Sequence, residues 1–152
     1  MAGSAKVWEE IQGQLAEVER KRVRIGIIGK DAGATHADGD STNAEIGLFM
    51  EFGTEWIPER SFLRKTFRNP AVLAEARALQ QRLIRAILEK GMDVDRALGL
   101  LGAWAVSKVR ETIIDGDISP PLAASTIAAK GSSRPLVDTG QLVSSISWVI
   151  VS

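Results

Sequence analysis

The tripeptide Asp138-Thr139-Gly140 is the segment whose residue types best match known catalytic chemistry. Asp-Thr-Gly is the signature of aspartic proteases, in which two carboxylates share one proton. Only 12 residues follow Gly140, and such a protease needs room after the motif for a flap and most of its core strands. A helix start is the better interpretation, with Asp138 as the N-cap and Gln141 at the N3 position. We therefore expect no catalytic residue here.

Two segments near residue 30 match ligand-binding motifs only in part. The segment Gly26-Ile27-Ile28-Gly29-Lys30 has two residues between its glycines, whereas a phosphate-binding P-loop has four. If Gly39 were the invariant glycine of a calcium loop ending at Glu45, Ala34 would be the first ligand, and alanine has no side-chain oxygen. His36 is the only histidine and the chain has no cysteine. No second histidine or cysteine is therefore present to complete a zinc site or a catalytic triad with it. We expect no enzyme activity, cofactor or metal.

Four basic residues lie within nine positions, with Phe62 and Phe67 among them: Arg60, Arg64, Lys65 and Arg68. A basic patch with interleaved aromatic residues can bind nucleic acid. The alternative is a short helix with the phenylalanines on its inner face and the basic residues solvated outside. Because 19 basic residues balance 19 acidic ones, a dedicated nucleic-acid-binding protein is disfavoured. The four residues stay as candidate DNA-facing residues, second to the structural interpretation.

The elements that would position these residues follow from apolar periodicity, which predicts amphipathic helices over 5–21, 71–90 and 94–115. Gly91 suits the position just after a helix, and Asp93 suits the N-cap of the next one. Since the link between the second and third helices is so short, we expect them to pack as an antiparallel pair.

Shorter signals predict the remaining elements. Thr42 and Glu45 form a capping box before a helix over 43–51, which Gly53 would end. Small, polar residues over 29–41 predict a flexible surface loop. The other expected elements are strands around 23–27 and 146–150, and short helices near 62–67, over 122–130 and from 138 to 144.

Length and composition fit one soluble domain that spans residues 1–152, with 45% apolar and 25% charged residues. The expected class is α+β, with a small antiparallel sheet packed against two long antiparallel helices, several short helices and extended loops. No run of 18 apolar residues is present, so we expect no contact with a membrane. Because no apolar run follows the first residues, we expect no secretory signal.

Two separated stretches, taken together, point to a family. The first is Glu51-Phe52-Gly53-Thr54 followed by Ile57-Pro58-Glu59-Arg60-Ser61-Phe62-Leu63-Arg64. The second runs from Pro120-Pro121-Leu122 through Ser125-Thr126-Ile127 and Lys130-Gly131-Ser132 to Pro135-Leu136-Val137-Asp138-Thr139-Gly140-Gln141-Leu142. This arrangement resembles the virion morphogenesis and tail-completion proteins of long-tailed bacteriophages. Three positions depart from the family, which often has proline where this chain has Ser61, Lys65 and Ala124.

The resemblance implies a structural protein of the phage neck, which completes the tail or joins head to tail as a ring around the DNA channel. It implies a hexamer, with a dodecamer as the alternative, that is made in the host cytoplasm and built into the virion beside other neck and tail proteins. Genomic DNA would pass through the ring. The alternatives are a tail terminator that caps the tail tube and a nucleic-acid-binding accessory protein.

In that setting, the loop 29–41 would order on assembly, and the prolines would hold their segment extended in advance. Trp56 would either anchor an interface or fold back on the core. The candidate interface residues are Asp31, Gly33, His36, Asp38, Gly39, Asp40, Trp56, Pro120, Pro121 and Pro135.

Overall fold

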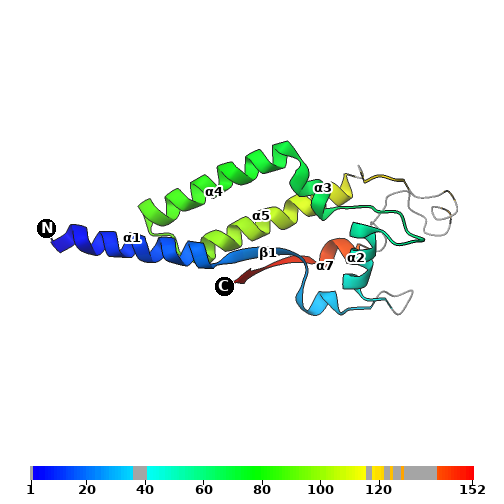
Figure 1. Cartoon of the computed structure of the whole chain (residues 1–152), viewed down its shortest axis with the longest axis horizontal. Coiled ribbons are helices and arrows are strands. Elements are labelled where there is room, and N and C mark those ends of the chain that lie inside the picture. Colours follow the sequence, from blue (N-terminus) through cyan, green and yellow to red (C-terminus); the bar gives the residue numbers. More distant parts are fainter. Residues whose placement is uncertain (1, 36–40, 116–117, 122–123, 125–127, 129–139) are drawn as a thin grey trace.

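A computed structural model describes residues 2–35, 41–115, 118–121, 124, 128 and 140–152. In chain order its elements are α1 (Ala2–Arg20), β1 (Arg22–Ile27), the 3-10 turn η1 (Gly29–Ala32), α2 (Asn43–Phe52), α3 (Leu63–Arg68), α4 (Pro70–Lys90), α5 (Val94–Ile114), α7 (Gln141–Ser145) and β2 (Ile146–Val151). The molecule is elongated, with α1 extending at one end and α2, α3 and α7 gathered toward the other (Figure 1). None of the helices that the structure describes is long and apolar enough to span a membrane.

The sheet joins the two ends of the chain. β1 and β2 pair antiparallel in a register that runs from Arg22 opposite Val151 to Ile27 opposite Ile146. Helix α5 lies against both strands, and α4 packs on α5 (Figure 1). The predicted α+β class and the antiparallel helix pair are confirmed, and of the two long helices it is α5 that covers the sheet.

Two apolar clusters form the core. The larger one surrounds Phe62, Val109 and Ile113, where α5 meets the sheet and the short helices. The smaller one lies where α4 ends and α5 begins, and it includes Ile87 and Val94, with the half-buried Val18 of α1 against it. Because the two clusters sit at different points along α5, the fold is long rather than spherical.

Trp148 on β2 can pack closely on α5 because two glycines face it. A Cβ atom built on Gly102 would lie 2.5 Å from Cδ2 of Trp148, and one on Gly99 would lie 3.2 Å from its Cη2. The first distance is far shorter than any real carbon–carbon contact, whereas the second asks only for a small adjustment. The missing side chain at Gly102 therefore sets how near the sheet approaches the helix.

Most helix ends lie where the sequence predicts. Thr42 and Glu45 form both hydrogen bonds of the capping box on α2. The Asp93 side chain accepts a hydrogen bond from the Arg96 amide at 2.9 Å, and Gly91 has the left-handed conformation that ends α4. Asn69 caps α4 and Pro70 is its first residue, so this dipeptide separates α3 from α4 as a boundary signal should.

Two predictions near the sheet need correction. The 29–41 segment begins with η1, and Thr35 and Thr42 form an isolated antiparallel bridge, so part of it is ordered structure. Helix α7 begins at Gln141 with Gly140 at the N-cap position, so Gln141 is the first helical residue and not at the predicted N3 position. The side-chain Nε2 of Gln141 donates to the Thr35 carbonyl at 3.1 Å. Asp138 and most of the predicted helix over 122–130 lie outside the described residues.

We predict that Gly102→Ala lowers the free energy of unfolding by about 1–3 kcal/mol, because the new methyl group overlaps the indole of Trp148 and either the helix or the strand must shift. The matched control is Gly13→Ala on α1, where a Cβ meets nothing within 4 Å and helix propensity should add up to about 1 kcal/mol. Thermal and urea unfolding of both variants would measure this. A Gly102→Ala chain as stable as the wild type would contradict the proposed packing.

Candidate functional site

The carboxylate of Glu51, in the last turn of α2, lies at the centre of a hydrogen-bond network. Glu51 is buried, with only 4% of the residue exposed. Oε2 accepts the amides of Phe62 at 2.8 Å and Leu63 at 2.9 Å, and Oε1 accepts the Arg64 amide at 3.0 Å. The Ser61 hydroxyl donates to Oε1 at 2.8 Å. These amides open α3, which has no capping side chain of its own, so Glu51 caps α3 from another helix.

The Arg64 guanidinium completes this network. Its Nε donates to Oε1 of Glu51 at 3.0 Å, and its Nη2 donates to the Glu51 carbonyl and lies 3.1 Å from Oε1 of Glu59. The guanidinium also stacks over the Phe52 ring, 4.7 Å from the ring centre. A planar cation with five N–H groups suits this combination of carboxylates, a carbonyl and a ring.

The Glu51 carboxyl is held in its ionised form. Burial on its own acts to raise the pKa of Glu51, but the amides of Arg64 and Leu63, the Ser61 hydroxyl and the Arg64 guanidinium together outweigh it and hold the pKa below its ordinary value of 4.5. The network is therefore an ionised structural unit at neutral pH, and it offers no proton for chemistry.

A short, tightly fixed loop connects α2 to α3. Gly53 has a φ of 72°, and a Cβ there would lie 2.9 Å from the Glu59 amide nitrogen, so only glycine fits without strain. The Thr54 amide donates to the Ile57 carbonyl at 2.8 Å, and the Thr54 hydroxyl accepts the Trp56 and Ile57 amides at 3.2 and 2.9 Å. The loop is thus closed by its own hydrogen bonds.

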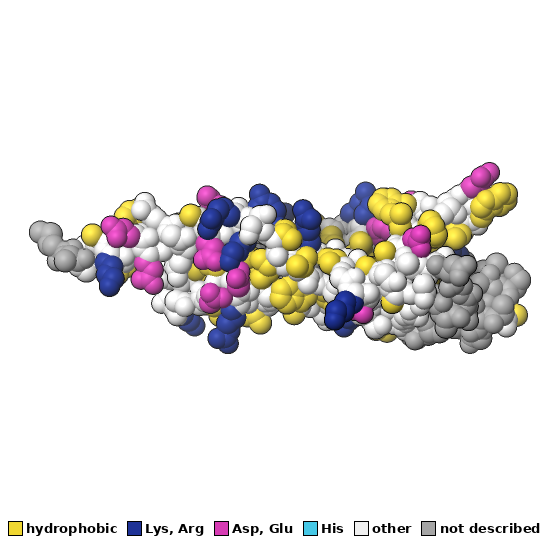
Figure 2. Space-filling view, turned by 90° about the horizontal axis from the view of Figure 1, so that it is seen from below, with side chains coloured by type: hydrophobic (Ala, Val, Ile, Leu, Met, Phe, Trp, Pro, Cys, Tyr) yellow, Lys and Arg dark blue, Asp and Glu magenta, His cyan; other side chains and the backbone are white. Residues whose placement is uncertain are grey.

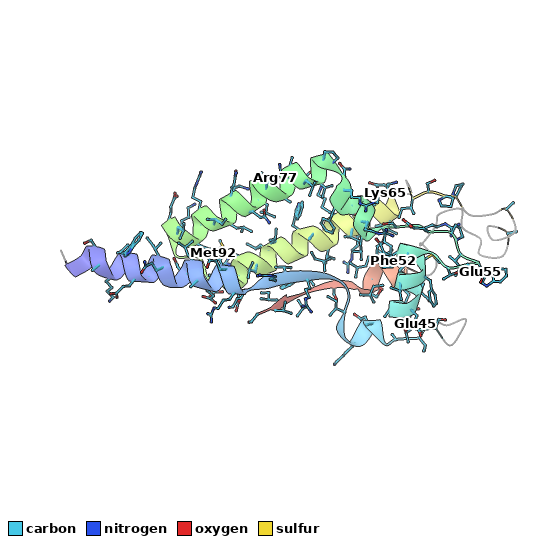
Figure 3. The ribbon with its side chains drawn as sticks, in the orientation of Figure 1. Glu45, Phe52, Glu55, Lys65, Arg77 and Met92 are labelled. Carbon is cyan, nitrogen blue, oxygen red and sulfur yellow. The ribbon has the colours of Figure 1, made fainter. Side chains whose placement is uncertain are left out.

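This loop presents a large apolar side chain to solvent. Trp56 is 85% exposed, so the alternative in which it folds back on the core is excluded. Leu48 and Phe52, one turn apart on α2, are also mostly exposed. We call Leu48, Phe52 and Trp56 the loop-end surface. Glu55 lies at the tip of the loop and Phe52 on α2 (Figure 3), and at this end of the molecule hydrophobic side chains project beside acidic ones (Figure 2).

The two stretches that carry the family resemblance meet at Arg60. This side chain is 7% exposed, and it donates through Nε to the Pro120 carbonyl at 2.9 Å and through Nη2 to the Pro121 carbonyl at 3.3 Å. Its amide donates to the Met50 carbonyl at 2.7 Å. Arg60 thereby ties the loop-end surface to a segment 60 residues later.

The basic cluster is not a continuous patch. Arg60 is buried and bonds to the Pro120 and Pro121 carbonyls, and Arg64 is half-buried and paired with Glu51 and Glu59. Lys65 is half-buried and Arg68 is exposed. Both line a shallow hollow beside Glu59 and Ser119, and Lys65 lies on α3 (Figure 3).

The predicted interface residues are only partly described. Asp31 and Gly33 lie in and after η1, and the Asp31 carbonyl accepts the Asn43 side-chain amide at 2.8 Å. His36, Asp38, Gly39, Asp40 and Pro135 lie outside the described residues. Among the residues that are described, no group of three or more His, Cys, Asp or Glu side chains could hold a metal ion.

Sequence reasoning missed the role of Glu51. The available signal was a short helix whose start, Ser61-Phe62-Leu63, follows a glutamate ten residues earlier with Gly53 between them. Local rules do not connect those positions.

No family model matches the chain, and neither the curated proteins nor the solved structures contain a match.

We predict that Glu51→Gln lowers the free energy of unfolding by about 1–3 kcal/mol at neutral pH, because an amide gives the buried donors one acceptor oxygen and sets an NH2 group against the others. Glu55→Gln in the same loop is the matched control, since Glu55 is exposed and the expected change is under about 0.5 kcal/mol.

The effect of Glu51→Gln should depend on pH. The pKa of Glu51 is lower in the folded state than its ordinary value of 4.5, so the unfolded chain binds the proton more readily. The stabilisation is fully present above pH 4.5 and is lost as the pH falls through the lower, folded-state pKa. Urea unfolding between neutral and acidic pH should show the wild-type and Glu51→Gln stabilities converging on acidification. Curves that stay parallel would contradict an ionised Glu51.

Proposed function

We propose that the chain is a structural component of a long-tailed bacteriophage neck that completes the tail or joins it to the head. The observation that carries the proposal is the bond from Arg60 to the Pro120 and Pro121 carbonyls. It shows that the two stretches resembling the tail-completion family are neighbours in space. Together with the Glu51 network they fix one loop, and the residue that this loop exposes most is Trp56.

A rigid loop with an exposed tryptophan is suited to docking on another protein. Tryptophan and arginine are enriched among residues that dominate binding energy, and a loop held by its own hydrogen bonds loses little conformational freedom on binding. The proposed partners of the loop-end surface are other neck and tail proteins. Within the neck the chain would form a ring, proposed as a hexamer with a dodecamer as the alternative, through head-to-tail contacts that close.

The balanced charge of the chain supports passage of DNA through such a ring. Each phosphate that a protein neutralises adds salt-dependent affinity, which would hold DNA rather than let it slide. The nucleic-acid-binding alternative is weakened, because Arg60 is buried against two backbone carbonyls and the charge of Arg64 is paired with Glu51 and Glu59. The tail terminator remains an alternative position for the same kind of structural protein.

The direct test is to locate the chain in virus particles. An antibody against the chain would be applied to virions purified from the host that carries its gene, and gold label would be located by electron microscopy. Label at the junction of head and tail is the expected result. Mass spectrometry that finds the chain in the lysate but not in purified virions would overturn the proposal.

We predict that Trp56→Ala leaves the free energy of unfolding within about 0.5 kcal/mol of the wild type, because the side chain is exposed. Incorporation into particles should fall by about tenfold or more, as expected for loss of an interface tryptophan. The control is Ile84→Ala, which removes another exposed apolar side chain, on α4. Quantitative mass spectrometry of virions measures both, and equal incorporation of the two variants would contradict a docking role for Trp56.

A further inference from the structure

Strand β2 has an open edge. In the part of the chain that the structure describes, the sheet has two strands, so β2 pairs with β1 on one side and with no strand on the other. A strand in an antiparallel ladder uses the backbone of every second residue, so the other amides and carbonyls of β2 point to the open side. β2 lies along the lower side of the molecule (Figure 1), and the view from below shows hydrophobic side chains gathered midway along it (Figure 2). Such an edge is a template for pairing with another strand.

The two strands of the sheet differ in charge. β1 carries two arginines, Arg22 and Arg24, and both are exposed. β2 has the sequence Ile-Ser-Trp-Val-Ile-Val, which contains no charged residue and consists almost wholly of β-branched and aromatic residues. Charged side chains protect an edge strand from pairing, and two β1 edges brought together would set like charges side by side. Of the two strands, β2 is therefore the one whose edge suits a second copy of itself.

A hollow beside the open edge of β2 has room for the side chains of an added strand. It has a volume of about 310 Å³, and its lining comes from α5 and β2 but not from β1: Ala103, Val106, Arg110, Ile146, Ser147 and Trp148. Trp148 is still 37% exposed, although its ring packs on α5. The Arg110 guanidinium donates to the carbonyls of Val143 and Ile146 at 3.1 and 2.9 Å, so the cation in the hollow already has acceptors. The surface that stays open is mainly apolar.

We propose that β2 pairs antiparallel with β2 of a second copy, which joins two two-stranded sheets into one in the order β1–β2–β2–β1. Identical strands in this arrangement are related by a two-fold axis perpendicular to the sheet, so both α5 helices lie on the same face. The residues of β2 on that face are Ile146, Trp148 and Ile150, because Trp148 packs on α5 and side chains alternate along a strand. In the pair these apolar side chains lie beside the hollow of the other copy.

The dimensions of the fold allow this pairing. Helix α5 lies against both strands. With its axis roughly midway between them, the two α5 helices would be roughly 10 Å apart, which is an ordinary helix–helix distance. Ala103, on the side of α5 that borders the hollow, is small and exposed, so it permits this approach. The contact is isologous and ends at two copies. It therefore goes beyond the ring of the proposed function and does not depend on it.

Charges placed on β2 test the contact in solution. Val149 is half-buried and lies on the face away from α5, so a charged side chain there reaches water in the folded chain. Association of the full chain is measured by sedimentation at increasing concentration for the wild type, Val149→Lys and Val149→Glu. The wild type should associate, and each variant should do so about tenfold or more weakly, because two like charges meet across the axis. An equal mixture of the two variants should recover association.

The matched control for these charges is Val7→Lys. It adds the same charge to α1, where Val7 is 55% exposed, so this variant should associate as the wild type does. Circular dichroism and thermal unfolding establish that each variant is folded. A wild-type chain that stays monomeric at every concentration, or a folded Val149→Lys chain that associates as strongly as the wild type, would overturn the proposal.

Cross-linking identifies the strands that meet, because the chain has no cysteine. In the two registers that pair the most residues, Val149 lies opposite Val149 or Ser147 of the other copy. Val149→Cys, alone or mixed with Ser147→Cys, should therefore form a disulfide between copies under mild oxidation.

Arg24→Cys is the matched control for cross-linking, since Arg24 lies opposite Val149 within one chain and on the same face of the sheet. In the proposed pair, the two Arg24 residues would be three strand spacings, about 14 Å, apart, which is too far for a disulfide. Arg24→Cys chains that cross-link to each other or to Val149→Cys chains as readily as Val149→Cys chains do among themselves would overturn the proposal in favour of a contact through β1.

Discussion

The buried carboxylate of Glu51 is the interaction on which the geometry of the loop end depends. Removing an ionised carboxylate from water is costly, and a single donor would not offset that cost. Three backbone amides, one hydroxyl and one guanidinium do so together, each at 2.8 to 3.0 Å. Three of these donors are the amides that α3 would otherwise leave without partners. The charge and the helix end therefore stabilise each other, and α2, the following loop and α3 behave as one unit.

Two of the four basic residues between positions 60 and 68 have their partners in or next to that unit. Arg64 is held between Glu51, Glu59 and the Phe52 ring, and Arg60 spans two consecutive carbonyls at Pro120 and Pro121. Proline has no amide hydrogen, so a segment rich in proline cannot donate to a neighbouring strand, but its carbonyls still accept. A guanidinium with several fixed donors is well suited to such a segment. Arg60 thus connects the two stretches, whereas Arg64 holds the first stretch together, and both arginines have structural contacts.

Local rules were sufficient for most of the fold and insufficient for this unit. The capping box at Thr42, the cap at Asp93 and the glycine at Gly91 act within a few residues, so the helix bounds they imply are confirmed. Period-two alternation was likewise enough to find both strands. The cap on α3 comes from ten or more residues away, and the direction of Arg60 depends on a segment 60 residues later, so neither could be derived from propensity or spacing. The same applies to Gln141, whose partner Thr35 is distant in sequence.

The sheet and α5 connect the two ends of the molecule. Only Lys21 separates α1 from β1, and its ammonium binds both Glu17 and Asp95, which raises the pKa of Lys21. The direction of α1 is therefore set by the strand and by the start of α5. On the other side, β2 follows α7 directly, and the Arg110 guanidinium of α5 donates to the carbonyls of Val143 and Ile146 across that junction. A protruding helix and an exposed loop are thus fixed relative to one framework.

Head-to-tail contacts close into a ring only when the angle between the joined surfaces repeats from copy to copy, and otherwise they give an open filament. A rigid connection between the surfaces is the physical condition for closure.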